Sequence, residues 1–153
     1  MDGSEEIRLA GNADLEAVRA LVHDAYVHYV PRIGLQPGPM RDDYERRIAA
    51  AQVWLLKRDQ RLLGLVVLED HDGFLLLDNV AVAPAAQGQG LGRRLIAFAE
   101  AEASRRDYDE VRLYTHVLMV ENIAIYQRLG FGEIARVHEK GFDRVYMAKH
   151  LTR

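Results

Sequence analysis

A glycine-rich stretch in the middle of the chain has the composition of an anion-binding loop. It follows an apolar run that ends at Val82 and leads into a helical pattern that continues to about residue 106. Glycines let a backbone approach a ligand closely, and the first N–H groups of a helix are free to bind it. This order of strand, turn and helix predicts a phosphate or pyrophosphate site, aided by the helix dipole. The residues of the turn are Gln87, Gly88, Gln89, Gly90, Leu91 and Gly92.

Two arginines follow this turn directly. Arg93 and Arg94 fall in the first turn of the predicted helix, where a cation is unfavourable for the helix dipole. A bound anion would offset that cost, and guanidinium groups make strong charge-assisted contacts with phosphate. Their position therefore supports the anion site.

Known phosphate-binding patterns narrow the choice of ligand. The dinucleotide fingerprint Gly-x-Gly-x-x-Gly fails in both frames, because Arg93 or Leu95 stands at its last position. The nucleoside-triphosphate loop needs a Gly-Lys-Ser/Thr triplet, which the sequence lacks. What stands here is Gln-x-x-Gly-x-Gly, formed by Gln87, Gly90 and Gly92.

This pattern resembles the acyl-CoA signature of the GNAT superfamily of N-acetyltransferases, and the preceding residues 80–84, VAVAP, are also typical of that family. Residues 121–131, ENIAIYQRLGF, resemble its second signature. There an asparagine, here Asn122, opens a helix, and a tyrosine, here Tyr126, follows one turn later. These two positions are i and i+4, so they share one helix face. Two signatures in this order make the resemblance specific.

The resemblance implies acetyl-CoA as co-substrate and assigns its contacts. Its pantetheine arm would pair with the backbone of Val80, Ala81 and Val82, as an added strand would. Its pyrophosphate would lie over residues 88–93, ending at Arg93. A backbone N–H near Val82 would polarise the thioester carbonyl, and Asn122 would bind the cofactor arm.

The resemblance also implies direct attack by a neutral amine, without a covalent enzyme intermediate. Tyr126 is then the candidate general acid for the departing thiolate. In histone-type members a glutamate on the strand before the loop acts as base, but residues 75–77 are all leucine here. Asp78, His116 or a water chain that ends on either of them remain the candidates. Asp78 shares a strand face with Leu76 by the period of two.

The elements that must position these residues follow from the apolar spacing. A helix is expected over residues 13–29, with Asn12 as its N-cap and Pro31 as its stop, then a loop to residue 40 and a helix over residues 41–51. The remaining expected helices cover residues 91–106 and 121–129. The expected strands cover residues 6–10, 53–57, 62–69, 74–82, 111–115, 131–137 and 144–149.

This order predicts a mixed α/β domain that spans residues 1–153. By resemblance it is the acyl-CoA N-acyltransferase (GNAT) fold: a mostly antiparallel mixed sheet of about six or seven strands, flanked by about four helices. The strands that end near Val82 and His116 would splay apart. Tyr26, Tyr29 and Tyr44 could line the acceptor pocket, in the part of the family that varies most.

Composition excludes several other classes. A net charge of −3 gives no footprint for nucleic acid, and the absence of cysteine excludes disulfides and thiolate metal sites. The six histidines show no ligand spacing for a metal. No apolar run approaches the length of a membrane span, and the N-terminus lacks signal-peptide features. We therefore expect a cytoplasmic enzyme without a nucleic-acid or membrane partner. By resemblance, because many family members pair as dimers, we also expect a homodimer.

Two alternatives stay open at the sequence level. A non-catalytic acyl-CoA-binding sensor could use the same fold, although a pure binder has no need of Tyr126 beside Asn122. A transferase for a longer acyl group depends on the space behind Val80. The acceptor amine, whether a small molecule, a peptide or a protein, is not specified by any motif.

Overall fold

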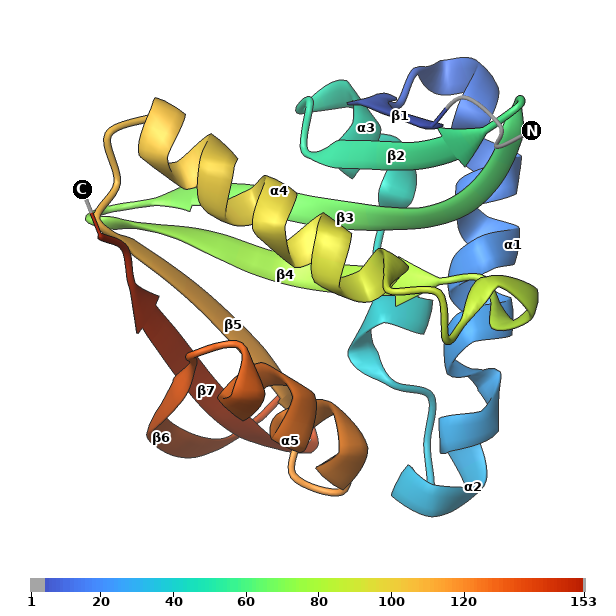
Figure 1. Ribbon diagram of the computed structural model, residues 1–153. Helices are drawn as coiled ribbons and strands as arrows, with labels where there is room; N and C mark the ends of the chain where they lie inside the picture. The colour runs from blue at the N-terminus through green and yellow to red at the C-terminus, as the bar shows by residue number, and fades with distance from the viewer. Residues whose placement is uncertain (1–4, 153) are drawn as a thin grey trace.

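One open sheet organises the chain in the computed structural model, which describes residues 5–152. Within these residues seven strands follow the order β1-β2-β3-β4-β5-β7-β6, and every neighbouring pair is antiparallel except β4 and β5. The predicted mixed, mostly antiparallel sheet is thus confirmed (Figure 1). The strands are β1 Glu5–Leu9, β2 Val53–Arg58, β3 Arg61–His71, β4 Phe74–Val82, β5 Glu110–His116, β6 Gly132–Glu139 and β7 Phe142–His150.

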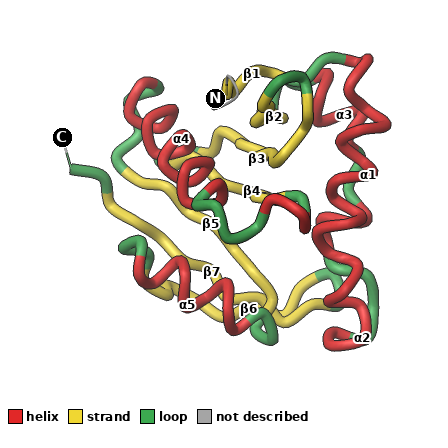
Figure 2. The backbone as a smooth tube through the Cα atoms, turned by 45° about the vertical axis from the view of Figure 1, so that its right-hand side comes forward, coloured by secondary structure: helices red, strands yellow, loops and turns green. Residues whose placement is uncertain are grey.

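Helices cover both faces of the sheet. Helices α4 (Leu91–Arg105) and α5 (Val120–Arg128) lie on one face. Helices α1 (Leu15–Tyr26) and α3 (Tyr44–Ala49) lie on the other, together with the one-turn helix α2 (Val30–Ile33), as Figure 2 shows. No helix within residues 5–152 is long and apolar enough to cross a membrane.

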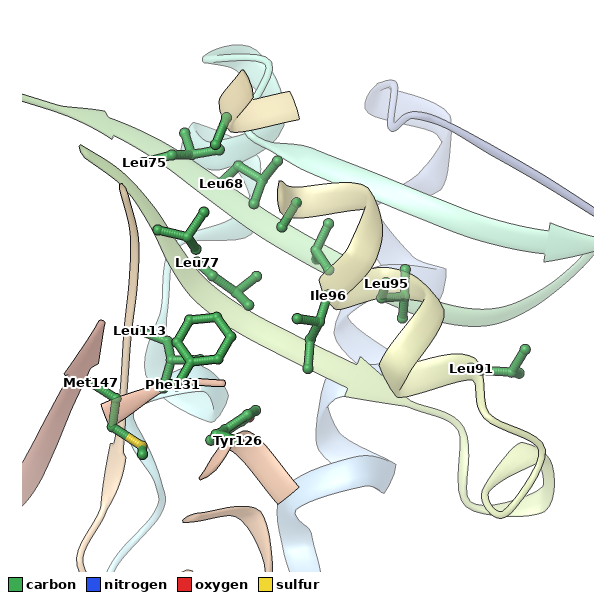
Figure 3. Packing of buried hydrophobic residues seen from close by; sticks show 14 of the residues in the cluster. Leu68, Leu75, Leu77, Leu91, Leu95, Ile96, Leu113, Tyr126, Phe131 and Met147 are labelled. Carbon is green, nitrogen blue, oxygen red and sulfur yellow. The ribbon is translucent and has the colours of Figure 1, made fainter. Parts of the chain in front are cut away.

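The packing of α4 fixes where its N-terminus lies. Leu95 is fully buried, at 0% exposure, and the apolar side chains of this helix recur at helical spacing and face β3 and β4 (Figure 3). Burial of each large side chain contributes roughly 1.5–3 kcal/mol. The first turn of α4 is thereby held beside the end of β4. The buried residues of this stripe are Leu91, Leu95, Ile96, Ala99 and Ala103.

A β-bulge interrupts β4 at Asp78. Val67 of β3 pairs with Asn79, and Leu68 pairs with Leu77, so that Asp78 is the extra residue. The bulge places the side chains of both Asp78 and Asn79 toward α3, and it reverses the alternation of the strand that follows. The apolar residues of β4 that pack with α4 are therefore Leu75 and Leu77 before the bulge and Val80 and Val82 after it.

Strands β4 and β5 separate beyond the bulge. Their parallel pairing covers three residue pairs and ends at Leu77 with Leu113. β4 continues to Val82 and β5 to His116, and no pairing joins these continuations within the described residues. The predicted splay is confirmed, and Figure 1 shows the two ribbons diverging from a common end.

The first helical region differs from the prediction. Pro31 does not stop the helix: α1 ends at Tyr26, a 3₁₀ turn follows, and Pro31 lies in the first turn of α2. A proline is tolerated there because the N–H that it lacks would have no intrahelical partner. The helical segment ends instead at Gly34, the C-cap of α2, whose φ of 90° suits glycine.

The caps of the two N-terminal helices also differ from the prediction. Asn12 begins a 3₁₀ turn and is not the N-cap; the carboxylate of Asp14 accepts the Gly11 N–H at 2.7 Å. The helix expected over residues 41–51 is shorter, because Asp43 caps α3 by accepting the Arg46 N–H at 3.1 Å. The other strands and helices match the prediction, with small shifts of their ends.

Candidate active site

Two cavities meet in the splay between β4 and β5. A groove of about 570 Å³ runs between the end of β4, the first turn of α4 and helix α5. A smaller cavity of about 40 Å³ lies between β4, β5, β7 and the turn at residues 37–39. The residues that line both are Tyr26, Val80, Asn122 and Tyr126. A ligand in the groove and a ligand in the small cavity can therefore meet at these residues.

The glycine-rich turn forms one wall of the groove. Gly88 and Gly90 have φ values of 83° and 79°, which side-chain-bearing residues rarely adopt, and Gly90 is the N-cap of α4. Gly92 and Arg93 also line the groove. The N-terminus of a 15-residue helix thus opens into a large groove, as an anion site requires.

Two polar residues of this stretch point elsewhere. Gln89 does not line either cavity, and its side-chain oxygen accepts a hydrogen bond from Arg58 at 3.2 Å. Arg94 forms an ion pair with Glu5 of β1. Of the two arginines in the first turn of α4, Arg93 is therefore the one that faces the groove.

Beyond Leu77, no strand among residues 5–152 pairs with the edge of β4 that faces the splay. The Ala83 N–H donates to a carbonyl of β3 at 2.8 Å, so alternation turns the backbone of Val80 and Val82 toward the splay. Two side chains confirm this direction. The Tyr26 hydroxyl donates to the Val80 carbonyl at 3.0 Å, and the Gln87 amide donates to the Val82 carbonyl at 3.4 Å.

Tyr126 lies where the two cavities meet. Its side chain is 9% exposed, and its ring packs edge-on against Phe131 with the centroids 6.3 Å apart. No residue among 5–152 forms a hydrogen bond with its hydroxyl. Burial raises the pKa of Tyr126, with a smaller contribution from Tyr29, so the phenol stays protonated and able to donate. Asn122, one turn earlier on α5, lines both cavities beside it.

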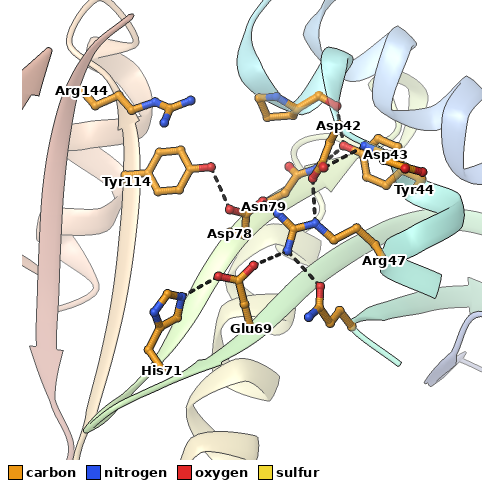
Figure 4. A network of polar contacts seen from close by, with 12 residues as sticks. Asp42, Asp43, Tyr44, Arg47, Glu69, His71, Asp78, Asn79, Tyr114 and Arg144 are labelled. Carbon is orange, nitrogen blue, oxygen red and sulfur yellow. Dashed lines mark hydrogen bonds and ion pairs between the residues drawn. The ribbon is translucent and has the colours of Figure 1, made fainter. Parts of the chain in front are cut away.

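Asp78 lies at the base of the small cavity and is held by two partners. Its carboxylate accepts from the Tyr114 hydroxyl at 2.8 Å and lies 3.2 Å from a guanidinium nitrogen of Arg47 (Figure 4). Burial raises the pKa of Asp78, and Arg47 opposes that rise. A carboxylate with a raised pKa beside a reaction site is suited to accept a proton.

His116 also lines the small cavity, but its geometry does not favour a base. Its Nδ1 accepts the Leu118 N–H at 3.1 Å, so the neutral ring carries its proton on Nε2 and has no free lone pair. Burial lowers the pKa of His116. Residues 5–152 contain no group of three or more His, Cys, Asp or Glu side chains that could hold a metal ion.

The three tyrosines from the N-terminal part lie at different places. Tyr26 lines both cavities, with its hydroxyl 2.6 Å from the side-chain oxygen of Asn79. Tyr29 lines the groove alone. Tyr44 is 3% exposed, accepts a hydrogen bond from Asn79 at 3.1 Å and donates to Pro39 at 2.5 Å. Tyr44 lines neither cavity and therefore lies outside the candidate acceptor site.

Sequence reasoning did not identify several polar residues of the small cavity. Tyr114 and Arg144 line it, and Arg47 supports Asp78 from the far side. None of them stands in a recognisable motif. The one signal available was position: Tyr114 precedes His116 by two residues on a strand and so shares its face.

Comparison with known proteins identifies the family. The sequence model of the acetyltransferase (GNAT) family matches residues 15–131. The chain belongs to this family. A mycothiol acetyltransferase from Jonesia denitrificans is 35% identical over 78 residues, which cover 50% of this chain. The match spans 25% of the length of that relative.

Solved structures share the fold over nearly the whole chain. The PaiA N-acetyltransferase from Thermoplasma acidophilum, solved in complex with coenzyme A, has a TM-score of 0.78 and 20% identity, with 96% of this chain and 99% of that chain covered. The ribosomal-protein-S18-alanine N-acetyltransferase from Escherichia coli has a TM-score of 0.75 and 20% identity, with 98% and 96% covered. These likenesses show the GNAT fold.

Proposed function

We propose that this protein transfers the acetyl group of acetyl-CoA directly to a primary amine. The observation that carries the proposal is the meeting of a large groove and a small cavity at Val80 and Tyr126. A direct transfer needs two substrates side by side, a donor that polarises the thioester carbonyl and an acid for the thiolate. Family membership and solved relatives that bind coenzyme A support acetyl-CoA as the donor.

The groove fits acetyl-CoA in three respects. Its volume of about 570 Å³ lies within the usual range of ligand sites. The backbone of Val80 and Val82 faces the splay, where no strand among residues 5–152 pairs with it. The pantetheine arm can therefore pair there in place of the side chains of Tyr26 and Gln87. The N–H groups at Gly88–Gly92 and the Arg93 side chain can hold the pyrophosphate. Asn122 is placed to bind the arm near the reacting end.

The transfer follows from the groups at the junction. The amine nitrogen in the small cavity attacks the thioester carbon, so that a C–N bond forms and the C–S bond breaks. We assign the polarising N–H to Val80, because Val80 lines both cavities whereas Val82 lines the groove alone. Tyr126 gives its proton to the departing sulfur. Asp78 receives the proton that the amine loses.

We also propose a cytoplasmic location, a single domain over residues 1–153 and a homodimer, on the grounds of composition and family resemblance.

Tyr126→Phe tests the proposed function. We expect kcat to fall about 100-fold, the low end for a lost general acid. Acetyl-CoA should bind as before, because no residue among 5–152 forms a hydrogen bond with this hydroxyl. Thiol release from acetyl-CoA against a panel of amines measures turnover. Tyr108→Phe is the matched control, because its hydroxyl donates to Asp70 at 3.0 Å outside both cavities. Equal loss in both variants, or none in Tyr126→Phe, would contradict the assignment.

A further inference from the structure

A buried arginine forms part of the small cavity. Arg144 of β7 is 7% exposed and lines the cavity together with Asp78, Tyr114 and Phe142. In the β5–β7 register it lies opposite His116. The proposed chemistry gives this cation no role, and a second cation in the form of a simple amine would be repelled by it.

The guanidinium group of Arg144 is held rigidly. Its central carbon lies 4.5 Å from the centroid of the Tyr114 ring and 5.2 Å from that of Phe142. Its Nη1 donates to Glu139 at 2.8 Å, and the same carboxylate accepts from the Tyr146 hydroxyl. A planar cation fixed by stacking and by one carboxylate has its remaining N–H groups pre-organised for a ligand.

The second amino group of Arg144 points to the wall formed by Gly38. A Cβ built at Gly38 would lie only 2.9 Å from Nη2 of Arg144, and Gly38 itself lines the cavity. Glu139 accepts from Nη1, so a carboxylate in the cavity that Arg144 lines would be bound by the remaining N–H groups of the guanidinium. A carboxylate matches this fork in geometry and charge.

The opposite wall carries the complementary charge. Asp78 lies at the far end of the Tyr114 side chain and accepts a hydrogen bond from its hydroxyl (Figure 4). The ring of the same tyrosine packs against Arg144. The cavity is small, at about 40 Å³, and it opens toward the groove at Tyr26 and Val80. Such a space suits a compact head group that bears an amine and a carboxylate, with any side chain directed outward.

We propose that the acceptor is an amino acid, or a close analogue with a carboxylate next to its amine, and that Arg144 binds this carboxylate. This inference rests on the proposed function, because the amine of the same molecule must reach Val80 and Tyr126. Arg144 thereby determines specificity and holds the amine toward the groove. It takes no part in proton transfer.

Matched pairs of acceptors test the inference. The probes are the common L-amino acids and their α-carboxamides, which keep the amine and remove the negative charge. We expect the best acid to exceed its amide in kcat/KM by about 10- to 100-fold, the range for one charged hydrogen-bonded contact. Arg144→Met should reduce this ratio to below about threefold and leave the KM for acetyl-CoA unchanged. Arg136→Met, an exposed arginine of β6 outside both cavities, should keep the ratio.

A second variant covers the case in which Arg144→Met does not fold. Gly38→Ala keeps both Arg144 and Glu139 and puts a methyl group 2.9 Å from Nη2, so that the guanidinium group must shift. The backbone at Gly38 is not in the left-handed region, so the methyl contact is the main effect. We expect Gly38→Ala to reduce the acid-to-amide ratio about fivefold or more.

Two results would overturn the inference while the proposed function stands: turnover of amides and simple amines as fast as of acids, or an acid preference that survives in both variants. If no acceptor is turned over, binding of N-acetyl amino acids to the protein with coenzyme A decides the matter. Binding that Arg144→Met abolishes supports the carboxylate site and counts against catalysis. Absence of binding overturns the site.

Discussion

Gly90 and Gly73 have similar backbone conformations. Substituting each of them distinguishes an effect on acetyl-CoA binding from an effect on folding stability. Gly90 has a φ of 79° at the start of α4, and Gly73 has a φ of 88° in the turn between β3 and β4. A Cβ would meet no atom within 4 Å at either site. Alanine in this conformation costs about 1–2 kcal/mol, so Gly90→Ala and Gly73→Ala should lower the free energy of unfolding by similar amounts.

Only one of the two substitutions should affect acetyl-CoA. The methyl group of Gly90→Ala would enter the groove, which Gly90 lines, whereas Gly73 lines neither cavity. Displacement of one backbone N–H from a phosphate oxygen costs about 1.5–3 kcal/mol, so we expect the Kd for acetyl-CoA to rise roughly 10- to 100-fold. Titration calorimetry measures this Kd, and urea unfolding compares the two stabilities. Equal acetyl-CoA affinity in Gly90→Ala and Gly73→Ala would refute the anion-loop reasoning.

Two further predictions concern the base and a helix cap. Asp78→Asn should lower kcat about 100-fold and His116→Ala less than about threefold, because only Asp78 has free acceptor capacity; the reverse order in steady-state assays would move the base to His116. Asp14→Ala should destabilise by about 1 kcal/mol at pH 7. The contacts from Arg8 and then Gly11 lower the pKa of Asp14, so this cost should shrink as the pH falls below the ordinary 3.8. Urea unfolding of the wild type and Asp14→Ala at pH 7 and at a pH below 3.8 checks this. A destabilisation by Asp14→Ala that is larger in acid than at pH 7 would contradict it.

The sequence predicted the cofactor side of the site because that side is local in the chain. The glycine turn and the start of α4 are contiguous, and Asn122 and Tyr126 share one turn of α5. Glycines predict the geometry of the turn, and a spacing of four residues predicts that two side chains share one helix face. Both features can be recognised in the sequence without knowledge of the tertiary structure.

The acceptor side could not be read in the same way. The bulge at Asp78 shifts the strand by one residue, which no periodic pattern shows in advance. Arg47 and Arg144 reach the cavity region from α3 and β7, far apart in sequence. From the sequence, Tyr44 is a pocket candidate because it lies in the variable N-terminal part, but α3 packs on the sheet and buries the Tyr44 hydroxyl against Asn79. These placements depend on tertiary packing.

A single-turnover experiment followed by mass spectrometry tests the central claim most directly. The protein is mixed with one equivalent of acetyl-CoA and an excess of amino-acid acceptors, and the masses of the protein, the acceptors and coenzyme A are measured over time. We predict that free coenzyme A and one acetylated acceptor form together while the mass of the protein stays unchanged. Acetyl-CoA that binds but keeps its acetyl group with every acceptor would contradict the account and favour a sensor.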